Sequence, residues 1–368
     1  MQFKNMLIPG KVGSKRIFYL DFLKAFAIFL VAVGHVSSQT LLYAPIDINW
    51  LIANFYSVFA KISIPIFIMI SGVLMLNRNY NFTDFVGKRF PRILIPFIFW
   101  GAIYVIFSFA FGFVEGKVPD YSSPLSILSF IGFMFLGQAG YLTHFWFVWM
   151  ILSVYLITPI INKWIKNSSF NEIEYFLIIW LITCAFTTFK LPYINIDLRY
   201  FAGPLGYFVL GYYLHNKKSK ILQNNWLWFI VLIVSTIIKV FIIYHNSIIA
   251  GTFQGVDYYD LTTVAEAVSL FLIFKNYAFN SNTLSNKPVS LSKGKFASVI
   301  LSLSIFTYGI YLSHLLLFKL LLINHVDFAS MNALISIPIF SLILLLVAWI
   351  SMIILSKIPF LKKFTGAV

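Results

Sequence analysis

The sequence predicts an all-α protein, a polytopic membrane bundle of about ten transmembrane helices with both termini in the cytoplasm. Of its 368 residues, 60% are hydrophobic and 11% are charged, whereas soluble domains have about 25% charged residues. The mean hydropathy is +0.88. A soluble fold of this length could not bury so much apolar surface. We therefore expect residues 1–368 to form a single membrane-embedded domain.

Ten apolar stretches can be read in order as spans, since a bilayer takes about 20 helical residues to cross. The first is too long for the apolar core of a signal peptide, and no small-residue cleavage site follows it. A further apolar stretch, Leu125–Leu136, is short for a span and suits a re-entrant or interfacial helix. The predicted spans are Ile17–Ser37, Leu51–Leu76, Pro91–Phe113, Phe145–Ile161, Tyr175–Phe189, Tyr200–Leu214, Trp226–His245, Leu261–Tyr277, Val299–Ile323 and Ala333–Ser356.

Lysine and arginine are segregated between alternate ends of these spans. Of the 27 such residues, 20 lie at the set of ends that includes the N-terminal segment 1–15 and the tail 357–368, and three lie at the other ends. The positive-inside rule places the basic set in the cytoplasm. The net charge of +15 therefore reflects membrane topology, and we expect lipid rather than nucleic acid as the surrounding partner.

His35 lies deep in the first predicted span, and Asp21 and Lys24 precede it. At 3.6 residues per turn these three positions share one helical face, with Lys24 and His35 roughly 16 Å apart along the axis. Ionisable groups within a span are costly and usually face the protein interior or a wet cavity. We expect Asp21 and His35 to be catalytic and Lys24 to bind the charged part of a substrate.

His314 and His144 are expected in the same outer membrane half as His35. Tyr308, Tyr311 and His314 follow one another at intervals of three, which makes a polar stripe on one helix. The stripe either lines a hydrophilic cavity or supplies interhelical hydrogen bonds. We expect His314 to be catalytic, and His144, Tyr308 and Tyr311 to bind substrate.

Arg89 and Arg92 share a face at the cytoplasmic start of the third predicted span. Two guanidinium groups could clamp a phosphate or diphosphate, or they could simply follow the positive-inside rule. Glu266 in the eighth span either pairs with Lys239 in the seventh or lines an acceptor site. Trp146, just after His144, is a weaker substrate-binding candidate.

Metal and nucleotide-hydrolysis motifs are not evident in the sequence. The single cysteine, Cys184, excludes an intramolecular disulfide, and no span carries a His-x-x-x-His or Glu-x-x-His pair. No P-loop occurs. We expect no metal site and no permanently bound cofactor.

The order of these motifs resembles the acyltransferase-3 family of integral-membrane O-acyltransferases, over nearly the whole chain. The resemblance rests on Asp21 to His35 and on four later segments, one of which carries Arg89 and Arg92. Lys24 stands where the family has arginine; lysine keeps the positive charge but loses the planar fork. The other three segments are Ile64–Gly72, His144–Phe147 and Phe306–His314.

The resemblance implies transfer of an acyl group, usually acetyl from cytoplasmic acetyl-CoA, to a hydroxyl of an extracytoplasmic glycan or lipid-linked sugar. The CoA phosphates would then meet Arg89, Arg92 and Lys24, and the thioester would reach His35. Neutral imidazole suits a base with a pKa near 6.5, and His35 would act as that base or carry the acyl group itself. The implied location is a bacterial plasma membrane. Some relatives carry a fused extracytoplasmic domain, which we do not expect here.

Two other classes compete with this interpretation. An exporter or flippase of a polysaccharide or lipid-linked sugar would also have many spans and a polar interior. Transporters often show inverted repeats with broken helices at matching positions, and no such repeat is visible. A non-catalytic membrane partner or sensor is the third class, and the oligomeric state stays open.

Overall fold

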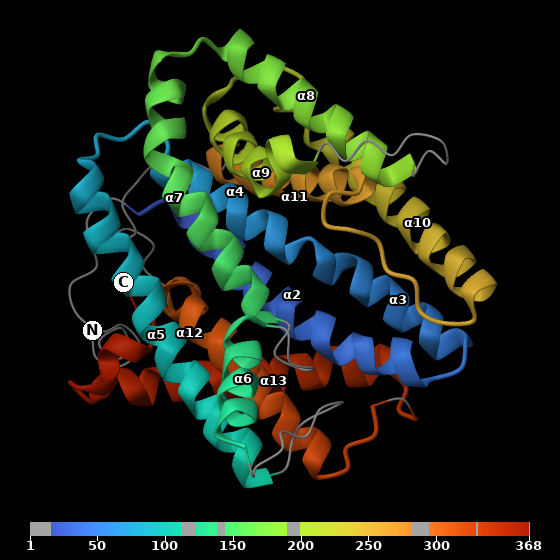
Figure 1. The fold of residues 1–368 in the computed structure, drawn as a ribbon. Helices are drawn as coiled ribbons and strands as arrows, with labels where there is room; N and C mark the ends of the chain where they lie inside the picture. Colours follow the sequence, from blue (N-terminus) through green and yellow to red (C-terminus); the bar gives the residue numbers. More distant parts are fainter. Residues whose placement is uncertain are drawn as a thin grey trace.

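The computed structural model describes residues 16–111, 123–137, 144–189, 199–280, 294–328 and 330–367, and these ranges are helical without any strand. A helix covers each of the ten predicted spans (Figure 1). The helices are α2 (Phe18–Tyr43), α3 (Ile48–Lys61), α4 (Ser63–Met75), α5 (Phe82–Phe111), α6 (Pro124–Phe135), α7 (Trp146–Asn167), α8 (Phe170–Phe189), α9 (Arg199–Asn216), α10 (Asn225–Ala250), α11 (Leu261–Asn280), α12 (Lys295–Ile323) and α13 (Ala333–Lys357).

Within the described ranges, eight helical stretches are long and apolar enough to cross a membrane, counting α3 and α4 together. Helices α9 and α11 occupy two further predicted spans but are not among the eight. The backbone of α9 departs from helical geometry at Gly203, and α11 carries the polar residues Glu266 and Lys275. The predicted polytopic helical bundle is confirmed, while its orientation in the membrane stays a prediction.

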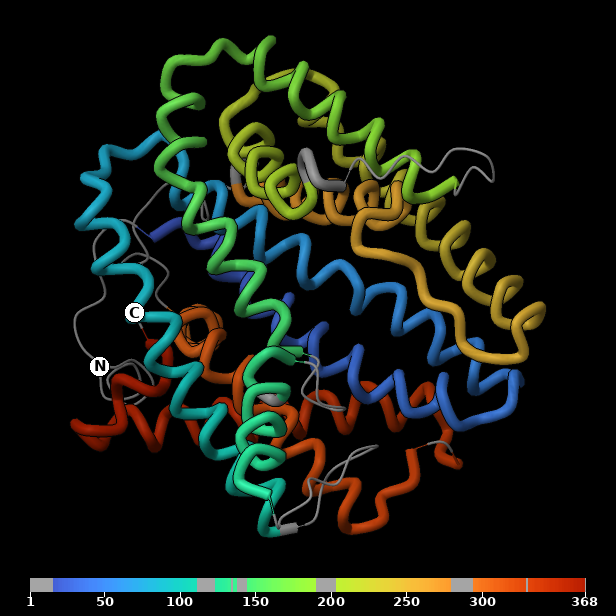
Figure 2. The backbone as a smooth tube through the Cα atoms, viewed as in Figure 1, coloured from blue at the N-terminus to red at the C-terminus, as the bar shows by residue number. Residues whose placement is uncertain are grey.

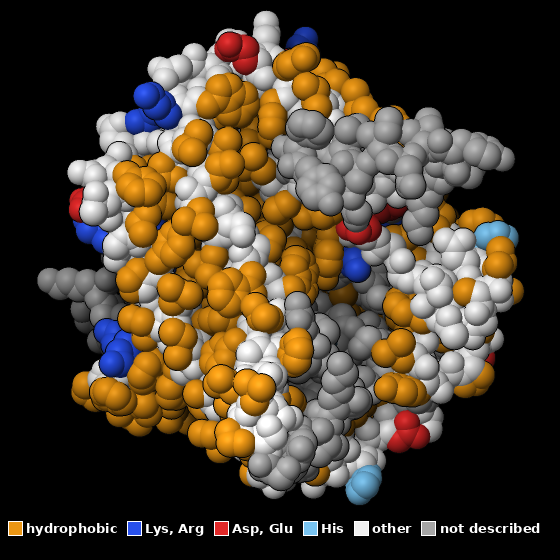
Figure 3. All heavy atoms as spheres, viewed as in Figure 1, with side chains coloured by type: hydrophobic (Ala, Val, Ile, Leu, Met, Phe, Trp, Pro, Cys, Tyr) orange, Lys and Arg blue, Asp and Glu red, His pale blue; other side chains and the backbone are white. Residues whose placement is uncertain are grey.

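Helices α2 and α12 form the centre of the bundle. Helix α2 packs against α3, α4, α12 and α13, and most of its apolar window is buried (Figure 1). Helices α8 and α10 are peripheral, with only 28% of their apolar windows buried inside the protein. Hydrophobic side chains consequently cover much of the surface in Figure 3. An apolar exterior around a more polar centre is what a bilayer-embedded bundle requires.

Helices α4 and α9 cross in close contact because glycines stand at the crossing. A Cβ atom on Gly72 would lie 1.8 Å from the backbone oxygen of Phe208. A Cβ atom on Gly211 would lie 2.1 Å from the backbone oxygen of Met69. Any larger residue would push the two backbones apart, so this contact follows the small-residue rule for membrane helices.

The second predicted span is divided between α3 and α4 at Ile62. Pro65 explains the position of the break: it has no N–H to donate to the carbonyl of Lys61, four residues earlier, and its ring crowds that carbonyl. At the break, the N–H of Ile62 donates to the carbonyl of Phe59 at 3.2 Å. The carbonyl of Val58 is thereby released from the usual helical pairing.

Helices α5, α6 and α7 lie side by side on one face of the bundle (Figures 1 and 2). Helix α6 confirms that the short apolar stretch at residues 125–136 is helical. After α13, a short 3-10 turn (Leu361–Phe364) folds back onto α5, where the indole N–H of Trp100 donates to the carbonyl of Phe364 at 3.1 Å. The expected tail after residue 357 is thus part of the packed structure.

Candidate functional site

A cavity of about 390 Å³ opens among α2, α4, α5, α7 and α12. Arg16 and Gly366 both line it, so the start of α2 and the end of the described chain lie at the same end of the bundle. Most of its walls are apolar, and its charged and hydroxyl-bearing residues are Arg16, Asp21, Lys24, Ser71, Arg89, Arg92, Tyr155, Ser304, Thr307, Tyr308 and Tyr311.

The charge in this cavity is predominantly positive. Its single carboxylate, Asp21, is held by Arg16, whose Nε donates to it at 3.0 Å, and by the hydroxyl of Ser304. Within the described part of the chain, no ion pair engages Lys24, Arg89 or Arg92. Three cations around a partly apolar cavity suit a ligand that carries several phosphate groups.

Three histidines, which the sequence placed only in the same membrane half, lie close together inside the bundle. The ring centroids of His35 and His314 lie 5.1 Å apart, and those of His144 and His314 lie 5.7 Å apart. They come from α2, α12 and the turn before α7. In the described ranges, no group of three His, Cys, Asp or Glu side chains is arranged to hold a metal ion.

The hydrogen bonding of His314 defines its tautomer. Its Nδ1 lies 2.6 Å from the carbonyl oxygen of Tyr311. A carbonyl only accepts hydrogen bonds, so Nδ1 carries the hydrogen and the neutral ring presents a lone pair on Nε2. That Nε2 atom is buried, and no described residue forms a hydrogen bond with it. The ring therefore offers a hydrogen-bond acceptor to the interior of the bundle.

Tyr311 connects the cavity to the histidines. Its ring lines the cavity and lies 5.8 Å from that of His314, while its hydroxyl donates to the carbonyl of His144. The hydroxyl of Tyr308 likewise donates to the carbonyl of Ile93, at 2.9 Å. The polar stripe thus serves both predicted roles, because the same side chains line the cavity and link helices.

Helix α2 is continuous from Phe18 to Tyr43, so helical geometry applies between Lys24 and His35. Lys24 lines the cavity, and His35 follows three turns later, roughly 16 Å along the axis. Asp21 lies fourteen residues before His35, roughly 21 Å away by the same rise. Asp21 forms its ion pair with Arg16 and lies too far from the histidines to act beside them.

Three predicted substrate-binding residues do not line the cavity: His144 belongs to the histidine cluster, and Glu266 and Trp146 lie elsewhere. Glu266 forms an ion pair with Lys239 at 2.7 Å, and both side chains are 0% exposed. Of the two alternatives from the sequence, the structural bridge is the one observed. The Trp146 ring lies 5.3 Å from that of Tyr258, while its neighbour Phe147 faces the cavity.

Sequence reasoning missed several cavity residues. In the sequence Arg16 contributes to the topology signal, and its place five residues before Asp21 at a helix start is the one indication of the ion pair. Tyr155 lies in an otherwise apolar stretch and offered no spacing signal. Gly366 lies far from every motif, and only folding of the chain end brings it to the cavity.

Comparison with known proteins adds a family and two curated relatives. The model of the "Acyltransferase domain" family matches residues 17–356. Nodulation protein NolL of Sinorhizobium fredii is 28% identical over 43% of this chain and 41% of its own length. Nodulation protein NolL of Mesorhizobium japonicum is 27% identical over 47% and 40%, respectively. The alignments therefore span about two fifths of these relatives. No solved structure matches.

Proposed function

The chain belongs to the acyltransferase-3 family, and we therefore propose that it is an acyltransferase that moves an acetyl group from cytoplasmic acetyl-CoA to a hydroxyl of an extracytoplasmic glycan or lipid-linked sugar. The supporting observation is the arrangement along α2. A cationic cavity lies at one end, and a cluster of three imidazoles lies about three turns further along the helix. The proposed location is the plasma membrane of a bacterium.

The donor would bind with its phosphates at the basic end of the cavity. Arg89 and Arg92 offer paired N–H groups to phosphate oxygens, and Lys24 adds a charge further along α2. Asp21 would hold Arg16 in place rather than take part in proton transfer. The distance between Lys24 and the histidines, roughly 16 Å, is comparable to an extended pantetheine arm.

The transfer step would take place at the histidine cluster. The sugar hydroxyl attacks the thioester carbonyl, and an imidazole nitrogen of His35 or His314 takes its proton. The C–S bond then breaks, and the CoA thiolate leaves and takes up a proton. Alternatively, His35 first accepts the acetyl group as an acyl-imidazole and the sugar hydroxyl attacks that intermediate. In both routes the products are an acetyl ester and CoA.

Mass spectrometry of surface and lipid-linked glycans tests this proposal, using cells with the gene, without it, and with a His35→Ala copy. We expect one acetyl group per repeat unit to be present only with the wild-type gene. If the glycan leaves the cytoplasm only with the gene and carries no acetyl group, the chain is an exporter or flippase instead.

A further inference from the structure

A second group of polar and aromatic side chains lies next to the histidine cluster but outside the cationic cavity. The Nζ atom of Lys61 lies 4.1 Å from the ring centroid of Tyr258. The rings of Tyr258 and Trp146 lie 5.3 Å apart and are inclined by 38°, so they form an angled pair rather than a stack. Lys61, Trp146 and Tyr258 are all partly exposed.

Two backbone connections place this group beside the histidines. Trp146 follows His144 by two residues, across the start of α7. Lys61 follows Ala60, and a Cβ atom on Gly34 would lie only 3.1 Å from the Cβ of Ala60. Gly34 immediately precedes His35, and Ala60 immediately precedes Lys61. Helices α2 and α3 are therefore in close contact next to the positions of His35 and Lys61. The backbones that carry Trp146 and Lys61 therefore adjoin those that carry His144 and His35.

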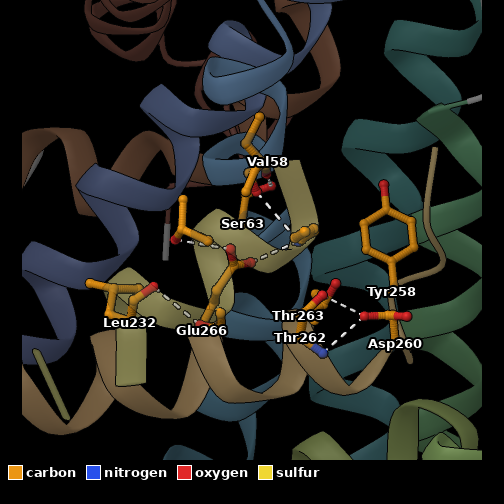
Figure 4. Close-up of polar contacts among 12 residues, drawn as sticks. Val58, Ser63, Leu232, Tyr258, Asp260, Thr262, Thr263 and Glu266 are labelled. Atoms are coloured by element: carbon orange, nitrogen blue, oxygen red, sulfur yellow. Dashed lines mark hydrogen bonds and ion pairs between the residues drawn. The ribbon is translucent and has the colours of Figure 1, made fainter. Parts of the chain in front are cut away.

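The break between α3 and α4 determines where Lys61 lies. The carbonyl of Val58, released at this break, accepts a hydrogen bond from Lys239 at 3.5 Å. The same ammonium group pairs with Glu266, whose other oxygen accepts from Thr236 at 3.1 Å (Figure 4). A fully buried ion pair thus supports the irregular backbone that carries Lys61.

The segment between α10 and α11 supplies the remaining members. Figure 2 shows it running back across the face of the bundle to the start of α11. The carbonyl of Tyr258 accepts a hydrogen bond from Tyr207 at 2.6 Å, which ties the segment to α9. Asp257 is exposed and acts electrostatically on Lys61. In Figure 3 a basic side chain lies beside acidic ones near the middle of a mostly hydrophobic face.

Resting on the function proposed above, we propose that Lys61, Trp146, Asp257 and Tyr258 form the acceptor subsite and bind a sugar ring of the glycan. A pyranose ring has an apolar face of C–H groups, which packs on aromatic rings, and an edge of hydroxyl groups. An ammonium group donates hydrogen bonds to hydroxyl oxygens, and a carboxylate accepts from hydroxyl hydrogens. Both kinds of group are present here, within reach of the same ring.

The proposed subsite lies outside the donor cavity, and its residues Trp146 and Lys61 adjoin the backbones that carry His144 and His35. Tyr311 lines the cavity and its ring lies 5.8 Å from that of His314, whereas Trp146 follows His144 by two residues outside the cavity. A hydroxyl of a bound sugar could then approach the proton acceptor without entering the donor cavity. Such positioning of two substrates against one base lowers the entropic part of the barrier.

The test measures steady-state kinetics and binding with the full chain in detergent. The acceptor probe is glycan extracted from cells that lack the gene, and the donor is acetyl-CoA. We expect Trp146→Leu, Tyr258→Leu and Lys61→Gln each to raise KM for the glycan at least tenfold and to leave KM for acetyl-CoA within twofold. Tyr258→Phe and Lys61→Arg, which keep ring and charge, should stay near wild type. The matched control is Trp226→Leu, because Trp226 is 77% exposed on α10.

The possible outcomes separate the subsite from the proposed function. Wild-type transfer with unchanged glycan KM in all three variants would overturn the subsite and leave the function intact. A parallel loss of acetyl-CoA binding would also overturn it. Glycan binding that quenches tryptophan fluorescence, depends on Trp146 and occurs without acetyl transfer would support the subsite and contradict the function. Absence of both binding and transfer would refute both.

Discussion

The imidazole rings of His35 and His314 lie 5.1 Å apart, although one belongs to α2 and the other to α12. His314 is oriented by the carbonyl of Tyr311, so its Nε2 presents a lone pair to the bundle interior. His35 is less buried than His314. In the transfer proposed above, one ring would take the proton and the other would position the hydroxyl.

Loss of either ring should slow the chemical step. His35→Ala and His314→Ala are each expected to lower kcat by about 10²–10⁴, the usual contribution of a positioned base. The measurement is acetyl transfer by purified variants, with folding checked by thermal unfolding in detergent. His245→Ala, at an exposed position on α10, is the control. Wild-type glycan acetylation by the His35 variant would contradict its proposed role.

Lys24 should act through its charge. We expect Lys24→Ala to weaken the use of acetyl-CoA, and Lys24→Arg to be tolerated because the resembled motif carries arginine at this position. The readout is KM for acetyl-CoA at a fixed glycan concentration. An inactive Lys24→Arg variant together with an active Lys24→Gln variant would show that charge is not the property required.

Arg89 and Arg92 should bind the phosphates of the donor. Hydrogen bonds to charged groups contribute about 1.5–3 kcal/mol, so the double alanine variant should weaken acetyl-CoA binding at least tenfold. Binding should also fall with rising salt concentration, and less steeply in the variant. Lys88→Ala is the matched control, because Lys88 is 69% exposed and pairs with Asp84. Unchanged acetyl-CoA binding would show that both arginines contribute only to membrane topology.

The Lys239–Glu266 pair should be important for folding. Removing one partner of a buried pair typically costs about 3–5 kcal/mol, whereas replacing both with apolar residues of similar volume costs far less. We therefore expect Glu266→Ala to lower the unfolding temperature strongly and Lys239→Met with Glu266→Leu to recover most of it. Asp84→Ala breaks an exposed pair and should change stability by less than about 1 kcal/mol. Equal effects at both sites would refute this expectation.

Topology can be tested by cysteine labelling on a Cys184→Ala background. Cysteines at Thr252 and Ser330 should react with an impermeant reagent in intact cells, and cysteines at Asn79 and Asn216 should react only after the membrane is opened. The segregation of Lys and Arg is the basis for this expectation. The reverse labelling pattern would place the cationic cavity outside, where cytoplasmic acetyl-CoA could not enter it.

Hydrophobic length and charge spacing were sufficient to predict the helical bundle, because these properties depend on the bilayer rather than on details of packing. Contacts between helices that are distant in the sequence were harder to predict. The three histidines were expected on one membrane half, but their contact depends on how α2, α7 and α12 pack. The sequence predicts a single span at Leu51–Leu76, although Pro65 is a local signal for the break at Ile62. Of the proposed subsite, the sequence indicated only Trp146; Tyr258 reaches Lys61 through the path of a connecting segment, for which the sequence holds no signal.

The returning chain end has a practical consequence for anyone producing this protein. Gly366 lines the cationic cavity, and the carbonyl of Thr365 lies 2.2 Å from where a Cβ atom on Gly309 would be. An affinity tag or fluorescent protein joined directly after Ala367 would therefore begin beside the cavity in which acetyl-CoA is proposed to bind. Recombinant forms with such fusions should be compared with forms from which the fusion has been cleaved before a weak donor affinity is attributed to the enzyme itself.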